Sequence, residues 1–544
     1  MPESDDSAIL IFDIFRPGAP RDGLRMGLIF FLGKGAAMKA NKTSDARCRE
    51  RSALESRAGC PRHIDSRLVP DSSLVSCVLC LVSCVLGLAA CVLCLAASAQ
   101  GAPAVYEAAE IFPLVSQHVH GSTVVELPNG DMLAAWFQGS GERWADDVAI
   151  MGARLRAGQK TWSKPFVMAD VPGFPDINPI LFIDPQDRLW LMWYTVIANQ
   201  WETSLPKYRI SENYQKPDGA PEWCWQEVLH VKPGDPAERG IQPGDRFVKS
   251  VERQIKEYSQ AVISQNRSMP ELVARGIIDR WAEDLLSKAR GEDMIRSGRL
   301  YDGTGQYTDQ KLGYPYFRRM GWQTKNKAVI VDDKRTIVPL YSDGFSFSLM
   351  AITDDGGATW QFSEPLVGAG NIQPSIARKA DGTLVAYMRD NGPPPQRLHV
   401  SSSTDKGLTW SLVMDSNLPN PGSGADLVTL QNGHWALAYN DTESGRHSLA
   451  VSISTDEGKT WPYTRHLERD MRDRQIATSS GYPSIIQGRD GILHVVYSYH
   501  HNDRQGGPSK TIKYVRFSET WVEQGDGEQK AEYRRQKAED GKTE

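Results

Sequence analysis

Three copies of one turn sequence decide the fold: Thr353-Asp-Asp-Gly-Gly-Ala-Thr-Trp360, Ser403-Thr-Asp-Lys-Gly-Leu-Thr-Trp410 and Ser454-Thr-Asp-Glu-Gly-Lys-Thr-Trp461. All fit the pattern Ser/Thr-x-Asp-x-Gly-x-Thr-Trp and recur about every 50 residues. The Asp side chain can accept backbone N–H groups, the Gly can take a positive φ, and the Trp can cover the sheet beneath. We therefore expect a hairpin turn in each copy, with a structural role. A weaker copy, Gly158 to Trp162, keeps the Thr-Trp end without the Asp.

A second repeat occurs six times, independently of the first. Each copy has a polar opening, a short β-rich run, a turn of Asn or Asp that often includes Gly, and a second apolar run. The copies open at His120, Asn178, Asn326, Gln373, Gly424 and Tyr482. Four short strands repeated at this period are typical of a propeller blade. The sequence predicts an all-β, six-bladed β-propeller over residues 112–518.

Two segments depart from this period. Between about Gly234 and Gly313, apolar residues recur at helical spacing and predict a two-helix insertion, about residues 235–312, between blades 2 and 3. The insertion is either a surface decoration packed on the propeller or a lid bordering its channel. The charged tail, residues 522–544, has few apolar residues to bury and is expected to be disordered.

The N-terminal part predicts export. Residues 1–73 are rich in Arg and Ser and are interpreted as a disordered leader or a mis-assigned start. Residues 74–99 resemble a signal peptide, because an uncharged apolar run ends in Ala97-Ser98-Ala99, which predicts cleavage near Gln100 and a periplasmic or extracellular protein. Two alternatives stay open: an uncleaved membrane anchor, and a lipoprotein whose box is Leu88-Ala89-Ala90-Cys91.

Composition narrows the classes of partner. The formal net charge of -5 gives no basic surplus, so nucleic acid is not an expected partner. Only Cys224 of the eight cysteines lies beyond residue 100, which excludes a disulfide framework in the folded part. Nothing around His118 and His120 has the ligand spacing of a zinc site, so the two histidines do not predict a metal pair. We expect no metal, no cofactor and no protein partner.

The polar residues that open the repeats should converge at the mouth of the central channel, together with residues of the loops that leave the same strands. Buried polar groups need partners, so this density of polar residues indicates a ligand site. The candidates are His120, Asn178, Lys327, Gln373, Asp426 and Tyr482 from the repeat openings, and Glu142, Asp146, Asp147, Arg389 and Arg446 from the loops.

These repeats resemble the Asp-box (BNR) repeats of the non-viral sialidase family over roughly residues 112 to 518. The resemblance implies a substrate carboxylate held by three arginines, a Tyr nucleophile activated by a Glu, and an Asp acid/base on a mobile loop. Bidentate guanidinium groups suit a carboxylate, and a neutral Tyr can attack an anomeric carbon beside that carboxylate without like-charge repulsion.

Carried onto this chain, the resemblance makes Tyr482 the nucleophile and Arg389 the second arginine, with Arg446 nearest to the third. The acid/base is one of Glu142, Asp146 and Asp147. Two positions depart from the family pattern. His118-Val-His120 stands where the family has Arg-Ile-Pro. Asn371-Ile-Gln373-Pro stands in the region where the family has its activating Glu, and Gln373 cannot act as a base.

Three functional hypotheses follow. The first is an exported exo-glycosidase of the exo-α-sialidase type, which hydrolyses a terminal, acidic sugar from a glycan. The second is a uronate-directed polysaccharide lyase that uses His120 or Tyr482 as base and Arg389 as the carboxylate clamp. The third is a propeller that binds glycans without catalysis. In each case the expected partner is a carbohydrate.

Overall fold

The computed structural model describes residues 104–527, except residue 243 and residues 266–269, 291–317, 473–476 and 503–506. The expected leader, the expected signal peptide and residues 528–544 of the expected tail lie outside the described residues. Among the described helices, none has both the length and the apolar character needed to cross a membrane.

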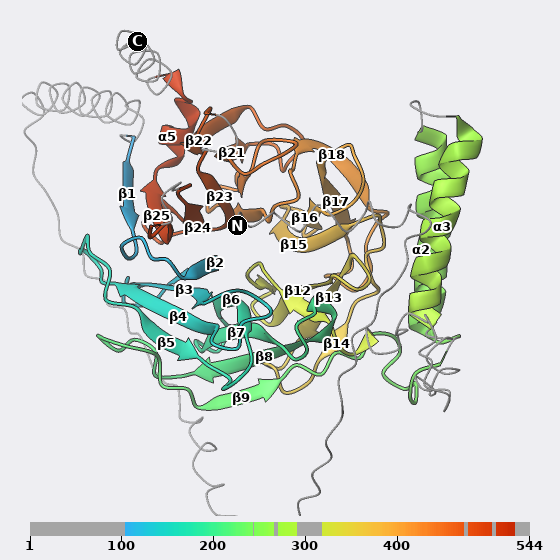
Figure 1. Ribbon diagram of the computed structural model, residues 1–544, viewed down its shortest axis with the longest axis horizontal. Helices are drawn as coiled ribbons and strands as arrows, with labels where there is room; N and C mark the ends of the chain where they lie inside the picture. The colour runs from blue at the N-terminus through green and yellow to red at the C-terminus, as the bar shows by residue number, and fades with distance from the viewer. Residues whose placement is uncertain are drawn as a thin grey trace, which may run out of the picture. The chain divides into compact units, whose positions relative to one another are not determined.

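The strands form six antiparallel sheets around a central axis, as Figure 1 shows. Blades 1 and 2 contain β2 (His118–Glu126), β3 (Met132–Gly139), β4 (Ala149–Leu155) and β5 (Phe166–Ala169), then β6 (Asp176–Ile183), β7 (Leu189–Val196), β8 (Ser204–Ser211) and β9 (Trp225–Val228). Blade 3 contains β10 (Trp322–Thr324), β11 (Val329–Val331), β12 (Arg335–Ser342), β13 (Phe347–Thr353) and β14 (Gln361–Phe362). The six-bladed propeller predicted from the sequence is confirmed.

The remaining blades follow the same order along the chain. Blades 4 and 5 contain β15 (Asn371–Arg378), β16 (Leu384–Asp390), β17 (Arg397–Ser403) and β18 (Met414–Pro419), then β19 (Asp426–Thr429), β20 (Trp435–Tyr439), β21 (Ser448–Ser454) and β22 (Tyr463–Arg469). Blade 6 contains β23 (Ser479–Gln487), β24 (Leu493–His500) and β25 (Lys510–Phe517). Its fourth strand is β1 (Tyr106–Glu110), so the first strand of the ring closes the last blade.

This closing strand lies before residue 112, where the sequence placed the start of the propeller. Four of its five residues are exposed, and β1 pairs only with β25, with Tyr106 opposite Phe517. An exposed edge strand has no apolar face, and therefore no period-2 pattern by which it could be recognised.

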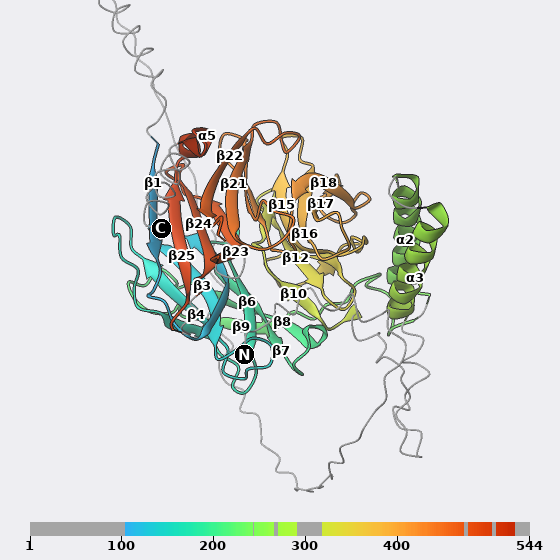
Figure 2. The same cartoon turned by 45° about the horizontal axis from the view of Figure 1, so that its top comes forward.

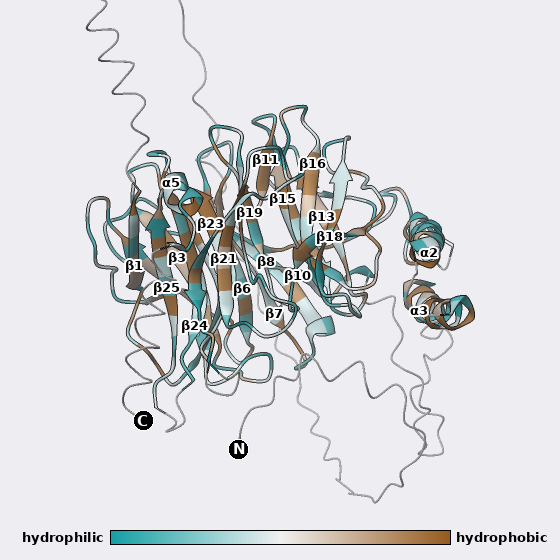
Figure 3. Cartoon of the chain, turned by 90° about the horizontal axis from the view of Figure 1, so that it is seen from above, coloured by the Kyte–Doolittle hydropathy of each residue, from teal (hydrophilic) through white to brown (hydrophobic). Residues whose placement is uncertain are grey.

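The core is divided among the interfaces between blades. Each of the six pairs of adjacent blades encloses its own cluster of buried apolar side chains, built from strands of both blades. In Figure 3 many strands are coloured as hydrophobic, while the connecting loops are largely hydrophilic. The polar loops and strand ends are thereby left free to line the two faces of the ring.

The three predicted turns have the expected hydrogen bonds. The carboxylates of Asp355, Asp405 and Asp456 accept the backbone N–H groups four residues on, at 2.9, 2.9 and 2.8 Å. The glycines two residues after these aspartates have φ of 89°, 88° and 83°. The turns join the third and fourth strands of blades 3, 4 and 5, and their role is structural, as predicted.

One of these glycines allows a test of the turn. A Cβ atom at Gly357 would lie 2.4 Å from Cη2 of Trp190 in the neighbouring blade, at a φ of +89°. Gly382 has nearly the same φ, +88°, but open space around it. We expect Gly357→Ala to lower the free energy of unfolding by about 2–3 kcal/mol and Gly382→Ala by about 1 kcal/mol, because only the first adds a clash to the backbone strain. Urea unfolding of both variants measures the difference, and equal losses would contradict the packing role.

The helical insertion is α2 (Arg246–Gln265) and α3 (Glu271–Arg290), in the predicted place between blades 2 and 3. Phe247, Val251 and Ile255 of α2 belong to the same buried cluster as strands of these two blades. The amide of Gln254 donates to the Pro365 carbonyl and accepts the Val367 N–H. Figures 1 and 2 both show the helix pair beside blades 3 and 4, away from the channel. Among the described residues the insertion is therefore a decoration of the outer wall.

The beginning of the predicted tail is ordered, which corrects the expectation for residues 522–527. Helix α5 (Glu519–Glu523) is capped by Ser518 and buries Trp521 and Val522. The Trp521 ring stacks on Tyr106 with centroids 4.6 Å apart. Asp526 then forms an ion pair with His466 of blade 5. Val522 and Asp526 of the predicted tail therefore have partners in the fold, which the charged composition of the tail did not indicate.

Candidate functional site

Four inner strands share one irregularity at the mouth of the channel. Asn178, Gln373 and Tyr482 have φ of 48°, 54° and 54°, and Gly121 has 63°. In each case the register of the innermost strand shifts at that point, between residues 120 and 123, 177 and 180, 372 and 375, and 481 and 484. A left-handed backbone at a residue other than glycine costs about 1–3 kcal/mol, and such strain gathers at functional sites. The bulges direct three of the predicted site residues toward one another.

Tyr482 lies at the centre of this group. Its hydroxyl accepts hydrogen bonds from Nη1 of Arg389 at 2.7 Å and from Nε2 of Gln373 at 3.1 Å. The His120 ring packs against the Tyr482 ring with centroids 4.1 Å apart. Three predicted residues, one from blade 1 and two from blade 4, therefore meet at the tyrosine of blade 6. Gln373 stands at the hydroxyl itself, where it can donate a hydrogen bond but cannot remove a proton.

Positive charge surrounds the same tyrosine. The guanidinium carbons of Arg446 and Arg389 lie 5.3 and 6.0 Å from the centre of its ring, and Nζ of Lys325 lies 5.5 Å from it. Lys325 donates to two neutral oxygens, the Asn326 side chain and the Pro483 carbonyl. Burial lowers the pKa of Lys325 to about 8, against the opposing effect of Asp426. An anionic ligand would offset the cost of burying these cations together.

Several polar atoms in the channel have no hydrogen-bond partner within the described part of the chain. They are Nε of Arg389, Oε1 of Gln373 and Oδ1 of Asn178, on side chains that are 7 %, 2 % and 4 % exposed. The other ends of the two amides are engaged, because Asn178 donates to Tyr194 and Tyr341 and Gln373 donates to Tyr482. One donor and two acceptors are thus left for a ligand that has both an acceptor and hydroxyl groups.

The two histidines of β2 are neutral at neutral pH. Burial, with Lys510 and His500 nearby, lowers the pKa of His118 to about 3. Burial and the Arg446 charge hold the pKa of His120 well below its usual value. The first arginine of the family pattern is therefore replaced here by uncharged rings, and the positive charge comes from blades 3, 4 and 5. Within the described ranges, no group of His, Cys, Asp and Glu is placed to hold a metal ion.

The three candidate acids lie in different surroundings. Asp147 is exposed and accepts hydrogen bonds from the Ser140 hydroxyl and N–H, which lower its pKa and give it a role in the turn. Asp146 is exposed. Glu142 is half-buried, and burial raises its pKa against the opposing charges of Arg143 and Arg446. Among the three, Glu142 is the carboxyl whose pKa is affected by Arg446 and whose Oε1 lies 3.9 Å from Nε2 of His118.

A family model described as a BNR repeat-like domain matches residues 130–237 and 317–495, more than half of the chain. The chain belongs to the BNR repeat-like domain family. The propeller of BNR repeats expected from the sequence is thereby confirmed.

Solved structures agree with this BNR-repeat fold. A protein of unknown function from Dyadobacter fermentans aligns with a TM-score of 0.50 and 14 % identity, over 76 % of this chain and 98 % of that one. The leech intramolecular trans-sialidase complexed with 2,7-anhydro-Neu5Ac aligns with a TM-score of 0.50 and 13 % identity, over 77 % of this chain and 71 % of that one. At such identities the likeness shows the fold alone. No curated protein matches the chain.

Two predicted binding residues of the BNR-repeat propeller have partners between the blades. Nζ of Lys327 lies 2.6 Å from Oδ2 of Asp426 and also donates to the Leu427 carbonyl. Asp426 is fully buried and accepts the Ser375 hydroxyl at 2.7 Å and the Ile485 N–H at 2.9 Å. The Lys327–Asp426 ion pair and the two hydrogen bonds that Asp426 accepts therefore join blades 3, 4, 5 and 6.

Sequence reasoning missed four residues of the channel: Lys325, Tyr194, Tyr341 and Asp343. Lys325 was missed because the repeat was taken to open one residue later, at Asn326. Tyr341 and Asp343 come from the end of β12 in blade 3, as Arg389 comes from the end of β16 in blade 4. Burial raises the pKa of Asp343 to about 6, against the opposing charge of Arg389. The sequence signal that could have identified Tyr341 and Asp343 is their position: they stand at the end of the second apolar run of the repeat in blade 3, as Arg389 does in blade 4.

Proposed function

We propose that this propeller is an exo-glycosidase that removes a terminal acidic sugar, with Tyr482 as its nucleophile. One observation carries the proposal: the Tyr482 hydroxyl lies against Arg389 in a channel that collects three cations and leaves polar atoms of Arg389, Gln373 and Asn178 without partners. A sugar supplies the hydroxyl groups, and its carboxylate supplies the negative charge.

The residues present divide the chemistry between them. The guanidinium groups of Arg389 and Arg446 suit a carboxylate, and the Arg389 hydrogen bond stabilises negative charge that develops on the Tyr482 oxygen. Tyr482 attacks the anomeric carbon while its proton passes to the neutral His120, whose basicity rises when an anionic sugar is bound nearby. Glu142 gives its proton to the departing oxygen. Water then attacks the anomeric carbon and gives a proton to the Glu142 carboxylate, while the displaced Tyr482 takes its proton back from His120.

The test uses the chain from Gln100 onward with a panel of 4-methylumbelliferyl glycosides that includes the sialoside and the glucuronide. Fluorescence released by the wild type and absent with Tyr482→Phe supports the proposal. Release that persists in the variant would remove Tyr482 from the chemistry. Saturable binding of glycans without any product would favour the non-catalytic alternative.

A lyase is the second candidate, because Gln373 takes the place of a base beside Tyr482. The phenolate form of Tyr482, stabilised by Arg389, would take the proton next to a uronate carboxylate; the leaving oxygen then departs with a proton from Glu142 as the C=C bond forms. Incubation with uronate-containing polysaccharides distinguishes the two reactions. Only elimination gives an unsaturated product that absorbs in the near ultraviolet.

The carboxyl groups of Glu142 and Asp343 should together determine how kcat/KM falls at alkaline pH. A general acid must be protonated, so kcat/KM should fall as pH rises through the raised pKa of Glu142. The negative charge of Asp343 contributes to that raised pKa. We expect Asp343→Asn to lower the pKa of Glu142 and move the alkaline limb to lower pH. Asp147→Asn is the matched control, and a limb that moves equally in both variants would contradict the assignment.

A further inference from the structure

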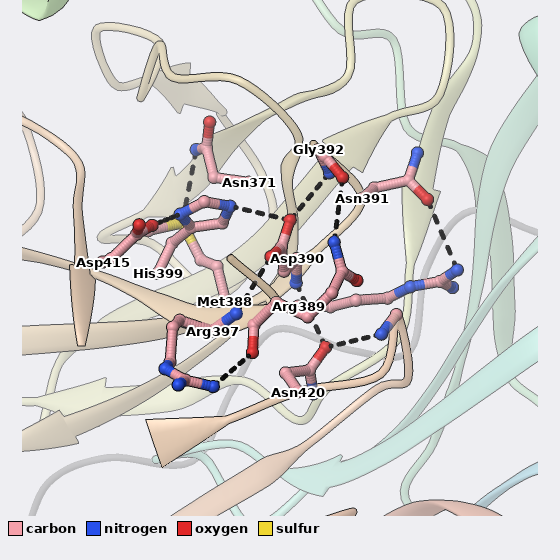
Figure 4. Close-up of polar contacts among 12 residues, drawn as sticks. Asn371, Met388, Arg389, Asp390, Asn391, Gly392, Arg397, His399, Asp415 and Asn420 are labelled. Atoms are coloured by element: carbon pink, nitrogen blue, oxygen red, sulfur yellow. Dashed lines mark hydrogen bonds and ion pairs between the residues drawn. The ribbon is translucent and has the colours of Figure 1, made fainter. Parts of the chain in front are cut away.

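Behind Arg389, on the side of β16 away from Tyr482, lies a buried histidine between two carboxylates. Nε2 of His399 in β17 is 3.3 Å from Oδ1 of Asp390, and its Nδ1 is 3.0 Å from Oδ1 of Asp415 in β18. His399 is 4 % exposed and Asp390 is 1 % exposed. Figure 4 shows the imidazole bridging these two aspartates. Nothing in the proposed reaction uses this group.

The Asp390 carboxylate fixes the loop that follows Arg389. It accepts the Gly392 N–H at 2.7 Å and the Arg397 N–H at 3.0 Å, while its own N–H donates to Asn420. Both ends of the loop thus converge on one carboxylate, as the dashed contacts of Figure 4 show. Asp390 is also the next residue after Arg389, and adjacent strand residues point to opposite faces. A fixed Asp390 therefore fixes where the Arg389 side chain leaves the strand.

His399 supplies the charge that this carboxylate needs. Burial opposes charging of the ring, but the ion pairs with the Asp390 and Asp415 carboxylates outweigh it and raise the pKa of His399 to about 9, so the ring is an imidazolium at neutral pH. Tyr258 of α2 also lies within electrostatic range of both aspartates, and burial together with their charges raises its pKa to about 12. A buried carboxylate without a cation at this position would be destabilised or would take up a proton.

Blade 5 repeats the arrangement at its own second strand. Asp441 pairs with His466 at 2.8 Å, and the other nitrogen of that ring pairs with Asp526 at 2.5 Å. Here the residue before the aspartate is Asn440, whose amide donates to the Ser448 and Ser480 carbonyls. The Asp–His–Asp unit therefore fixes a strand end in both blades. In blade 4 the side chain placed by that strand end is Arg389.

We propose that His399 is a positioning residue for the carbohydrate site: through Asp390 it holds Arg389 against the Tyr482 hydroxyl. The expected effect of His399 on turnover rests on the proposed function. The effect of His399 on the 2.7 Å hydrogen bond between Arg389 and Tyr482 can be tested without any substrate.

The experiment compares His399→Gln with His494→Gln. His494 is an equally buried histidine, 4 % exposed, that pairs with Tyr514 near the turn between β23 and β24, at the strand ends remote from Tyr482. Crystal structures of both variants should show the Arg389–Tyr482 hydrogen bond broken only in His399→Gln. On a substrate that the wild type cleaves, kcat/KM should fall about 10²-fold in His399→Gln, as expected for a misplacement near 1 Å, and less than about 2-fold in His494→Gln.

Two further single variants and one double variant test the same link between His399 and Arg389. Asp390→Asn should cause the same fall in kcat/KM, and the double variant no more than either single one, because both act through one hydrogen bond. If His399→Gln does not fold, Asp415→Asn removes only the outer carboxylate and should give a smaller fall of the same kind. An intact Arg389–Tyr482 hydrogen bond in a folded His399 or Asp415 variant overturns the inference. If the wild type shows no turnover, but that hydrogen bond is broken only in the His399 variant, the proposed function alone is overturned.

Discussion

Tyr482→Phe should lower kcat by about 10³-fold or more on every glycoside that the wild type cleaves, because the substitution removes the attacking oxygen and leaves the ring in place. The phenyl ring still packs against His120 and still lies among the three cations, so affinity for the released sugar should change little. Steady-state kinetics, together with calorimetric binding of the sugar, separates these two effects.

Tyr341→Phe is the matched control for this result. The Tyr341 hydroxyl accepts hydrogen bonds from the amides of Gln373 at 3.3 Å and Asn178 at 3.4 Å, but not from Arg389. Its removal takes one hydroxyl from the network without removing the proposed nucleophile, so kcat should fall less than about 10-fold. A similar fall in both variants would mean that the hydroxyl network, and not the attack by Tyr482, limits the reaction.

The repeats made the ring predictable, whereas single residues of the site depended on tertiary contacts. The Asp355, Asp405 and Asp456 turns carry their own hydrogen-bond partners four residues away, so their sequence determines their structure. The edge strand β1 has no such local signal, because it is defined by its pairing with β25 at the other end of the chain.

The residues of the site divide in the same way, into those marked by a repeat and those placed by tertiary contacts. Tyr482, Gln373 and Arg389 were found because each opens or ends a repeat, and the structure brings all three to one hydroxyl. Lys325 was missed because its neighbours Asn326 and Lys327 gave an equally good opening. Which of the three carboxyls near Ser140 faces the channel also depended on the path of an irregular loop. Alternation along a regular strand could not determine it.

The buried carboxylate of Asp426 predicts the largest loss of stability. It is fully buried and is contacted by three other blades: Lys327 of blade 3, Ser375 of blade 4 and the Ile485 N–H of blade 6. Asp426→Asn keeps the shape but leaves the Lys327 ammonium without its counter-ion, and it turns an NH₂ group toward a donor. Breaking a buried pair from one side costs about 3–5 kcal/mol.

Lys327→Met distinguishes the contribution of the Lys327 charge to stability from that of the hydrogen bonds accepted by Asp426. This variant removes the cation but leaves the Asp426 carboxylate with the Ser375 hydroxyl and the Ile485 N–H, so its loss of stability in urea unfolding should be smaller than that of Asp426→Asn. If Asp426 instead bound the substrate, the Asn variant would unfold within about 1 kcal/mol of the wild type while KM rose. The order of the two stabilities therefore distinguishes a carboxylate that joins the blades from one that belongs to the carbohydrate site.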